Sequence, residues 1–335
     1  MRTDPLRLRS DLLLLLTAVI WGFAFVGQRA GTAHVGPFAF NATRFFIGGL
    51  VLLPVMVWSD RRRLTADRRP SIAHLDPPAS EAADSAVGGR PSAVGGLLVG
   101  AVLFAAATLQ QAGISFTTAG KAGFITSLYV VIVPLLGVAL GHRIGRATWL
   151  GALLAAVGLY FLTMQPGELR MAPGDLLVLI GALLWAIHML LLGRLSPGRD
   201  PARLAFVQFM TCAALSGLAA LLFETTTAGG LRGALPAILF TGVLSVGVGY
   251  TLQVAGQRHA PPADTAIILS LEAVFAVLAG RLLLGEQLAA RALVGCGLML
   301  AGILISQVMS EEARVAGNEK RVAGGAESAA SDVDG

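Results

Sequence analysis

Ten long apolar segments are the feature that most constrains what this chain can fold into. They cover residues 11–29, 37–58, 94–114, 119–140, 146–164, 174–194, 202–223, 234–256, 263–284 and 289–309. Each has about the 20 apolar residues that a helix needs to cross a hydrocarbon core of roughly 30 Å. The segments are continuously apolar rather than alternating, and lipid cannot satisfy the backbone of an open strand. The sequence therefore predicts an all-α, polytopic integral membrane protein with ten transmembrane helices.

Composition and motifs argue against a soluble protein and against an enzyme. Hydrophobic residues make up 55% of the chain and charged residues 13%, whereas soluble domains carry about 25% charged residues. Cys212 and Cys296 both lie inside predicted spans, where a disulfide or a metal site is not expected. The chain has no phosphate-binding loop, no zinc-protease motif and no Cys/His cluster at metal spacing. We therefore expect no catalytic residues, no metal and no cofactor.

Basic residues predict the orientation of the helices. With the N-terminus inside, 18 of the 25 Lys and Arg residues fall at the cytoplasmic ends and loops, and five fall on the outer side. This asymmetry follows the positive-inside rule and places both termini in the cytoplasm of an inner-membrane protein. It also explains the net charge of +5 without nucleic acid as a partner. Residues 1–10 form a cytoplasmic N-terminus, 59–93 a cytoplasmic loop, and 310–335 a disordered cytoplasmic tail.

The last five segments repeat the first five. At a spacing of 164, Asp11, Trp21, Pro37 and Phe45 match Asp175, Trp185, Pro201 and Phe209; at 143 or 144, Gln110, Gly113, Gly151 and Gly158 match Gln253, Gly256, Gly295 and Gly302. The repeats are residues 11–164 and 174–309. Because each repeat has an odd number of spans, the second enters the membrane upside down. Inverted repeats are typical of secondary transporters, whose site lies between the copies near the bilayer midplane.

The segments TAVIWGFAFVGQRAG, PFAFNATRFFIGGL, TTAGKAGFITSLYVVIVPLLG, ALLWAIHMLLLGRL and ILSLEAVFAVLAGRLLLGEQL occur in this order. In them the chain resembles the EamA family of ten-span permeases in the drug/metabolite transporter superfamily. The resemblance covers nearly the whole chain outside the 59–93 loop and the tail. It implies a single-chain inner-membrane permease that exports metabolites or amino acids by alternating access. Members commonly have Pro after the glutamate of the ninth span, but this chain has Ala273, so the proline that would imply a helix kink there is missing.

Charged residues inside the spans are the first site candidates, because a buried charge is costly and rarely persists without a partner or a cavity. Glu272 lies about 15 Å into the ninth span, near the bilayer centre, and we assign it no counterpart in the first repeat. It is a candidate proton site or substrate-charge site; the alternative is a structural carboxyl that joins helices. Arg44, whose counterpart is Gln208, shares a helix face with Asn41. These two residues would present donors to an anionic substrate, unless Arg44 snorkels to the interface.

Uncharged polar and aromatic residues complete the set of candidates. His188 would suit a proton relay, although an isolated histidine is more often satisfied locally. Gln110 and Gln253 occupy equivalent positions and either contact substrate or join helices. Tyr129 would line a path one turn from Thr126, and Trp21 and Trp185 would stack on a flat substrate or simply fill space. The glycines at 151, 158, 295 and 302 indicate close packing between the fifth and tenth spans or toward a second copy in a homodimer.

These features predict a secondary transporter that moves a small metabolite, such as an amino acid or a related compound, across the cytoplasmic membrane, in the direction of export. Its partners would be a small-molecule substrate, the lipid bilayer and coupling protons. The main alternative is a broad multidrug efflux carrier, for which an apolar, aromatic cavity would be diagnostic. A membrane enzyme or scaffold is the non-transport alternative. Because the scaffold is shared by the two repeats, we expect functional residues where the copies differ.

Overall fold

The computed structural model describes residues 5–67, 93–117, 119–163, 173–284 and 290–306. These residues form helices and connecting turns, without a strand among them. The helices are α1 (Pro5–Gly31), α2 (Pro37–Asp67), α4 (Ala93–Ile114), α5 (Ala119–Ser127), α6 (Tyr129–Ala139), α7 (Arg146–Thr163), α8 (Pro173–Leu195), α9 (Pro201–Phe223), α10 (Ala228–Phe240), η1 (Thr241–Tyr250), α11 (Thr251–Gly256), α12 (Pro262–Leu269) and α13 (Glu272–Leu284), followed by a final helix, Ala290–Ser306.

A helical region occupies each of the ten expected positions. Eight are long and apolar enough to cross a membrane, while Arg146–Leu162 and Ala290–Ser306 are shorter apolar helices. The all-α prediction is therefore confirmed, and the described residues contain eight helices long enough to span a membrane and two shorter apolar helices. Two boundaries differ from the sequence prediction, since α1 begins at Pro5 and α2 continues to Asp67. The first residues of the expected 59–93 loop are thus helical, and residues 307–335 of the tail lie outside the described residues.

The fourth and ninth spans are each broken in the middle, at equivalent positions. The fourth consists of α5 and α6, with Leu128 between them, and the ninth consists of α12 and α13, with Ser270 and Leu271 between them. The breaks have the same hydrogen bond, from Leu128 N to Ile125 O and from Leu271 N to Ile268 O, both 3.2 Å long. These are tight three-residue turns of the 3₁₀ type.

The ninth span is broken although it lacks the proline at position 273 that would imply a kink. Instead of proline, Ser270 supplies the local perturbation, because its hydroxyl donates to the carbonyl of Ile267 over 2.7 Å. A serine that bonds back to its own helix competes with the backbone pattern and bends the helix. Pro134, by contrast, lies inside α6 rather than at the break in the fourth span.

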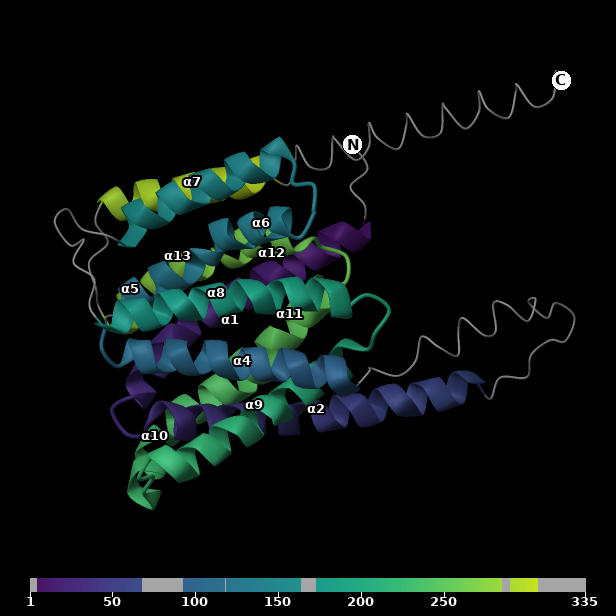
Figure 1. Cartoon of the computed structure of the whole chain (residues 1–335), viewed down its shortest axis with the longest axis vertical. Helices are drawn as coiled ribbons and strands as arrows, with labels where there is room; N and C mark the ends of the chain where they lie inside the picture. Colours follow the sequence, from purple (N-terminus) through teal and green to yellow (C-terminus); the bar gives the residue numbers. More distant parts are fainter. Residues whose placement is uncertain (1–4, 68–92, 118, 164–172, 285–289, 307–335) are drawn as a thin grey trace, which may run out of the picture.

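Counterpart elements of the two repeats face each other, as a twofold relation between inverted copies requires. Phe45 of α2 and Phe209 of α9, which are repeat counterparts, have ring centroids 6.1 Å apart. The final helix packs against α7, with Gly302 against Gly151 and Gly295 against Gly158, so these two counterpart helices run antiparallel. In Figure 1, α7 and the final helix lie along one edge of the molecule and α2, α9 and α10 along the opposite edge. The broken helices lie between these edges.

The glycine contacts between α7 and the final helix are close enough to exclude any side chain. A Cβ on Gly158 would lie 2.7 Å from the carbonyl oxygen of Gly295, and a Cβ on Gly151 would lie 2.7 Å from that of Gly302. The predicted packing between the fifth and tenth spans is therefore present within one chain. Small residues at such crossings let backbones approach and gain van der Waals contact, which drives helix association in lipid.

We expect Gly158→Ala to destabilise the protein by about 1–3 kcal/mol, because the new methyl group must push the final helix away. The measurement is the thermal unfolding of purified protein in detergent. Gly297→Ala is the matched control, since a Cβ there meets nothing within 4 Å and alanine favours the helix. Equal unfolding temperatures for the two variants would contradict the proposed close packing.

Candidate functional site

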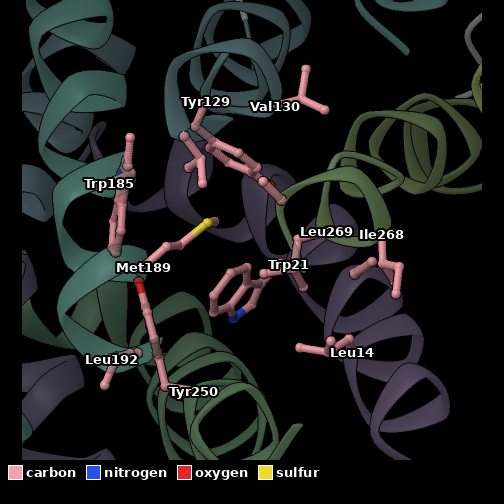
Figure 2. Packing of buried hydrophobic residues seen from close by; sticks show 14 of the residues in the cluster. Leu14, Trp21, Tyr129, Val130, Trp185, Met189, Leu192, Tyr250, Ile268 and Leu269 are labelled. Carbon is pink, nitrogen blue, oxygen red and sulfur yellow. The ribbon is translucent and has the colours of Figure 1, made fainter. Parts of the chain in front are cut away.

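A cavity lies between the two repeats, at the middle of the helices. Its volume is about 30 Å³, which is room for one or two water molecules. The lining residues come from both repeats: Trp21, Phe25, Gln28, Arg44, Gln110, Thr126, Tyr129, Trp185, Met189, Ser245, Tyr250 and Glu272. Figure 2 shows the rings of Trp21, Tyr129, Trp185 and Tyr250 around the side chain of Met189. The wall is thus largely aromatic, and it contains one acid and one base.

Glu272 is the acid of the cavity and is almost fully buried, with 3% of its surface exposed. Its Oε1 accepts hydrogen bonds from the hydroxyl of Tyr129 at 2.9 Å and from that of Ser127 at 3.4 Å. The residue is also the first of α13, where the helix dipole favours negative charge. Two donors and a helix N-terminus therefore compensate for the loss of water around the carboxyl group.

The expectation that Glu272 has no counterpart in the first repeat is wrong. Glu272 begins α13 just as Tyr129 begins α6, and the two positions are related by the 143-residue spacing that also relates Gln110 to Gln253. The sequence hides this relation because a tyrosine and a glutamate differ in chemistry, although Ser-Leu precedes both. The copies differ at this position, and the structure brings the two different side chains into contact.

Arg44 is the base of the cavity, with 2% of its surface exposed. Its Nε donates to Oδ1 of Asn41 over 2.9 Å. The two residues lie on one helix face, as expected, and bond to each other. The guanidinium lies over the rings of Phe45 and Phe40, 4.9 and 5.5 Å from their centroids. None of the ion pairs found among the described residues involves Arg44. Cation–π contacts and one amide therefore stabilise a buried charge that has no carboxylate there.

The aromatic wall is held in place by the π-helical segment η1. Trp21 donates from Nε1 to the carbonyl of Ser245 over 3.1 Å, and its ring lies 4.6 Å from that of Tyr250. Trp185, the repeat counterpart of Trp21, stacks on the other side of Tyr250 at 5.8 Å. Both rings therefore pack on the same tyrosine. Such π-helical turns often occur at functional sites, because the extra residue per turn shifts side chains to a new direction.

Three predicted site residues do not line the cavity. Asn41 contacts it only through Arg44, and His188 hydrogen-bonds through Nε2 to Oε1 of Gln208 at 2.9 Å, behind Trp185. Gln253 is buried elsewhere, and its amide atoms have no hydrogen-bond partner in the part of the chain that the structure describes. Its counterpart Gln110 does line the cavity and donates to Thr126 over 3.0 Å. Gln110 and Gln253 therefore have different surroundings although they are repeat counterparts, and only Gln110 lines the cavity.

Several lining residues were not predicted, and helical spacing could have found some of them. Phe25 and Gln28 lie four and seven residues after Trp21, and Met189 lies four residues after Trp185, so each shares a face with a predicted residue. The lining residue Ser245 carries no such signal, because it lies in a π-helix, and neither does Ser127, which bonds to Glu272 from the residue before a helix break. Within the described ranges no cluster of three or more His, Cys, Asp or Glu residues could hold a metal ion.

Comparison with known proteins agrees with this architecture. A family model described as the EamA-like transporter family matches residues 8–164 and 172–307. The chain belongs to the EamA-like transporter family. It is 32% identical over 300 residues to an uncharacterized transporter of Archaeoglobus fulgidus, covering 89% of this chain and 86% of that protein. An uncharacterized transporter of Bacillus subtilis is 26% identical over 299 residues, covering 88% of this chain and 92% of that protein.

A solved crystal structure has a similar fold. Its TM-score is 0.69 at 19% sequence identity, over 90% of this chain and 98% of that chain. At this identity the likeness concerns the fold alone. Together with the family match and the apolar helices, it supports a multi-pass membrane transporter that contains two inverted repeats.

In this EamA-like protein the helices are tied together at the end of the bundle that the basic residues predict to be cytoplasmic. Arg7 of α1 forms an ion pair with Asp264 of α12, with Nη2 and Oδ2 2.6 Å apart, and a second pair with Asp11 at 3.3 Å. Thr148 of α7 donates to Asp264 over 3.4 Å. In the sequence Arg7 is one of the basic residues that predict a cytoplasmic end, and nothing marks Asp264 as its partner, because the two residues are 257 positions apart.

The opposite end is tied by contacts to backbone and hydroxyl groups. Arg29 donates to the carbonyl of Ile114 over 2.5 Å, and Gln111 donates to the carbonyl of Gln28 over 3.2 Å. Thr117 donates to Asp175 over 2.5 Å. Hydrogen bonds therefore join helices at both ends of the described part of the EamA-like protein, on either side of the cavity.

We expect Asp264→Asn to destabilise the folded protein by about 3 kcal/mol, because it leaves a buried arginine with a weaker partner. The measurement is thermal unfolding in detergent. Asp200→Asn is the matched control: Asp200 caps α9 by accepting from Ala202 N, a role that asparagine also performs well. If Asp264→Asn were no less stable than this control, the ion pair would have no structural importance.

Proposed function

We propose that this protein is a secondary transporter that exports a small zwitterionic metabolite, such as an amino acid or a related compound, by alternating access. The observation that carries the proposal is a cavity between the inverted repeats whose lining contains one guanidinium and one carboxyl group. A substrate carboxylate would bind the planar donor fork of Arg44. Its ammonium group would bind Glu272, while Phe25, Met189 and the aromatic rings would contact the side chain.

Two features support alternating access. The cavity holds only one or two waters, so a metabolite requires a conformation in which the helices have separated at one end. The broken helices α5/α6 and α12/α13 provide places where half-helices could tilt, and broken helices at the midplane are typical of carriers with inverted repeats. We further propose that both termini lie in the cytoplasm and that the membrane is the cytoplasmic one, following the basic residues.

Multidrug efflux is the second candidate function, and the rings of Trp21, Trp185 and Tyr250 favour it. Carriers of this kind bind apolar cations on aromatic surfaces, for which Glu272 would supply the counter-charge. Against it stands Arg44, since a buried arginine in the same cavity repels a cationic drug. A protection phenotype against cationic drugs, retained or improved in an Arg44→Gln variant, would favour efflux over the zwitterion carrier.

The substrate class is tested with ligand analogues. A thermal-shift screen of the proteinogenic amino acids identifies the best ligand, which is then compared with its methyl ester and its N-acetyl derivative. We expect both derivatives to bind about 10- to 100-fold more weakly, because each leaves one buried charge without its partner. Arg44→Gln, which introduces the residue of the second repeat, should abolish discrimination against the ester and keep discrimination against the N-acetyl derivative. Equal binding of all three ligands would exclude a zwitterion site.

Coupling to protons is tested with Glu272→Gln in proteoliposomes. We expect uptake driven by a proton gradient to be lost while exchange of labelled for unlabelled substrate persists, since glutamine can hydrogen-bond the substrate but cannot exchange a proton. Glu224→Gln is the control, because Glu224 accepts from the backbone of Phe38 and Ala39 at the start of α2, outside the cavity. Gradient-driven uptake that remains in Glu272→Gln would show that another group carries the proton.

A further inference from the structure

The hydrogen bond between Tyr129 and Glu272 joins two positions that are counterparts in the repeats. Each residue begins the second half of a broken helix, and Ser-Leu precedes each at the break. A contact between counterparts lies on the twofold relation of the copies, as the Phe45–Phe209 contact does. In this chain one copy supplies a phenol hydroxyl and the other a carboxyl group, which makes the contact a donor–acceptor pair.

We propose that Tyr129 is the positioning residue for the Glu272 carboxyl group and ties its charge state to the packing of the two broken helices. Its hydroxyl, supported by that of Ser127, holds the ionised carboxylate against the start of α6. The hold weakens when the carboxylate takes up a proton from water on one side of the membrane, and it returns when the proton leaves to the other side. The coupling of this hydrogen bond to transport rests on the proposed function, whereas the positioning of the carboxylate by Tyr129 does not.

The strength of this hydrogen bond depends on the charge of its acceptor. A hydroxyl that donates to a carboxylate forms a bond roughly twice as strong as one that donates to a neutral group. Protonation therefore weakens the contact at the point where the starts of α6 and α13 meet. Because α12 packs against α6 and α13 against α5, loosening this contact acts on all four half-helices, and these are the segments whose backbone is already interrupted.

Tyr129 is distinguished from the other groups around Glu272 by direct contact. The charged or titratable residues that share the cavity with Glu272 are Arg44 of α2, Tyr129 of α6 and Tyr250 of η1. Among the described residues, only Tyr129 and Ser127 donate hydrogen bonds to its carboxyl group. The remaining lining residues from α1, α4, α5, α8 and η1 do not titrate; they are Trp21, Phe25, Gln28, Gln110, Thr126, Trp185, Met189 and Ser245.

The proposal is tested by infrared spectroscopy of the full-length protein in lipid nanodiscs. The protonated carboxyl band that is absent from Glu272→Gln reports the protonation of Glu272 as a function of pH. In Tyr129→Phe we expect the midpoint of this titration to move to higher pH by about one to two units, because a donor that favours the anion has been removed. Ser127→Ala should give a smaller shift in the same direction, since its bond is longer.

Tyr160→Phe is the matched control, because Tyr160 contacts Phe161 and Arg291 instead of Glu272, and its midpoint should equal that of the unsubstituted protein. A folded Tyr129→Phe variant with an unshifted midpoint overturns the proposal, as does a shift to lower pH. If Tyr129→Phe does not fold, the direction of the Ser127→Ala shift decides by the same criterion.

Transport measurements separate this inference from the proposed function. We expect the pH at which uptake driven by a proton gradient is half-maximal to move in Tyr129→Phe by the same amount as the infrared midpoint. A shifted infrared midpoint in a protein that transports no zwitterion would support the hold on Glu272 and refute the proposed substrate. An unshifted midpoint together with transport that depends on Glu272 would refute the positioning role of Tyr129 and leave the proposed function intact.

Discussion

The centre of this protein depends on one constraint, which is that its charged side chains must be stabilised without contact with water. Lipid and packed helices offer no solvation, so an acid or a base in the middle of a span requires partners supplied by other helices. Glu272 has two hydroxyl donors and a helix N-terminus, and Arg44 has aromatic faces and one amide. The two charges are stabilised separately and are not paired with each other in the described structure. Each therefore remains available to a ligand group of opposite charge.

The helix breaks follow from the same constraint. A continuous ninth helix would satisfy all of its own backbone groups, leaving Glu272 to depend on side chains alone. Interrupting it at Ser270 and Leu271 places the carboxyl group on the first residue of a new helix, where free amide groups and the dipole favour an anion. The equivalent break in the fourth span places Tyr129 at the corresponding position of the other copy. The inverted repeat thus brings the two breaks together, and the different residues at this position make the contact a donor–acceptor pair.

Sequence alone predicted the all-α class, the helical regions and the inverted repeat, and it marked Glu272 and Arg44 as site candidates, because length, hydropathy and buried charge are local properties. It did not predict which faces meet. In soluble helices a polar stripe marks the exposed face, but these helices are apolar all round, so position on a face carries little signal. For that reason His188 and Gln253 could not be separated from Gln110, and the partners Arg7 and Asp264, or Tyr129 and Glu272, could be identified only in three dimensions.

Charged groups take part in closing both ends of the bundle. At the predicted cytoplasmic end an ion pair joins Arg7 of α1 to Asp264 of α12, whereas at the opposite end Arg29 donates to a backbone carbonyl and the Asp175 carboxylate accepts from a hydroxyl. Separating the helices at either end exposes these charges to water, which recovers much of their solvation. Opening at either end is therefore compensated by hydration. Under the proposed alternating access, substrate binding in the cavity has to change only the difference in free energy between opening at one end and opening at the other.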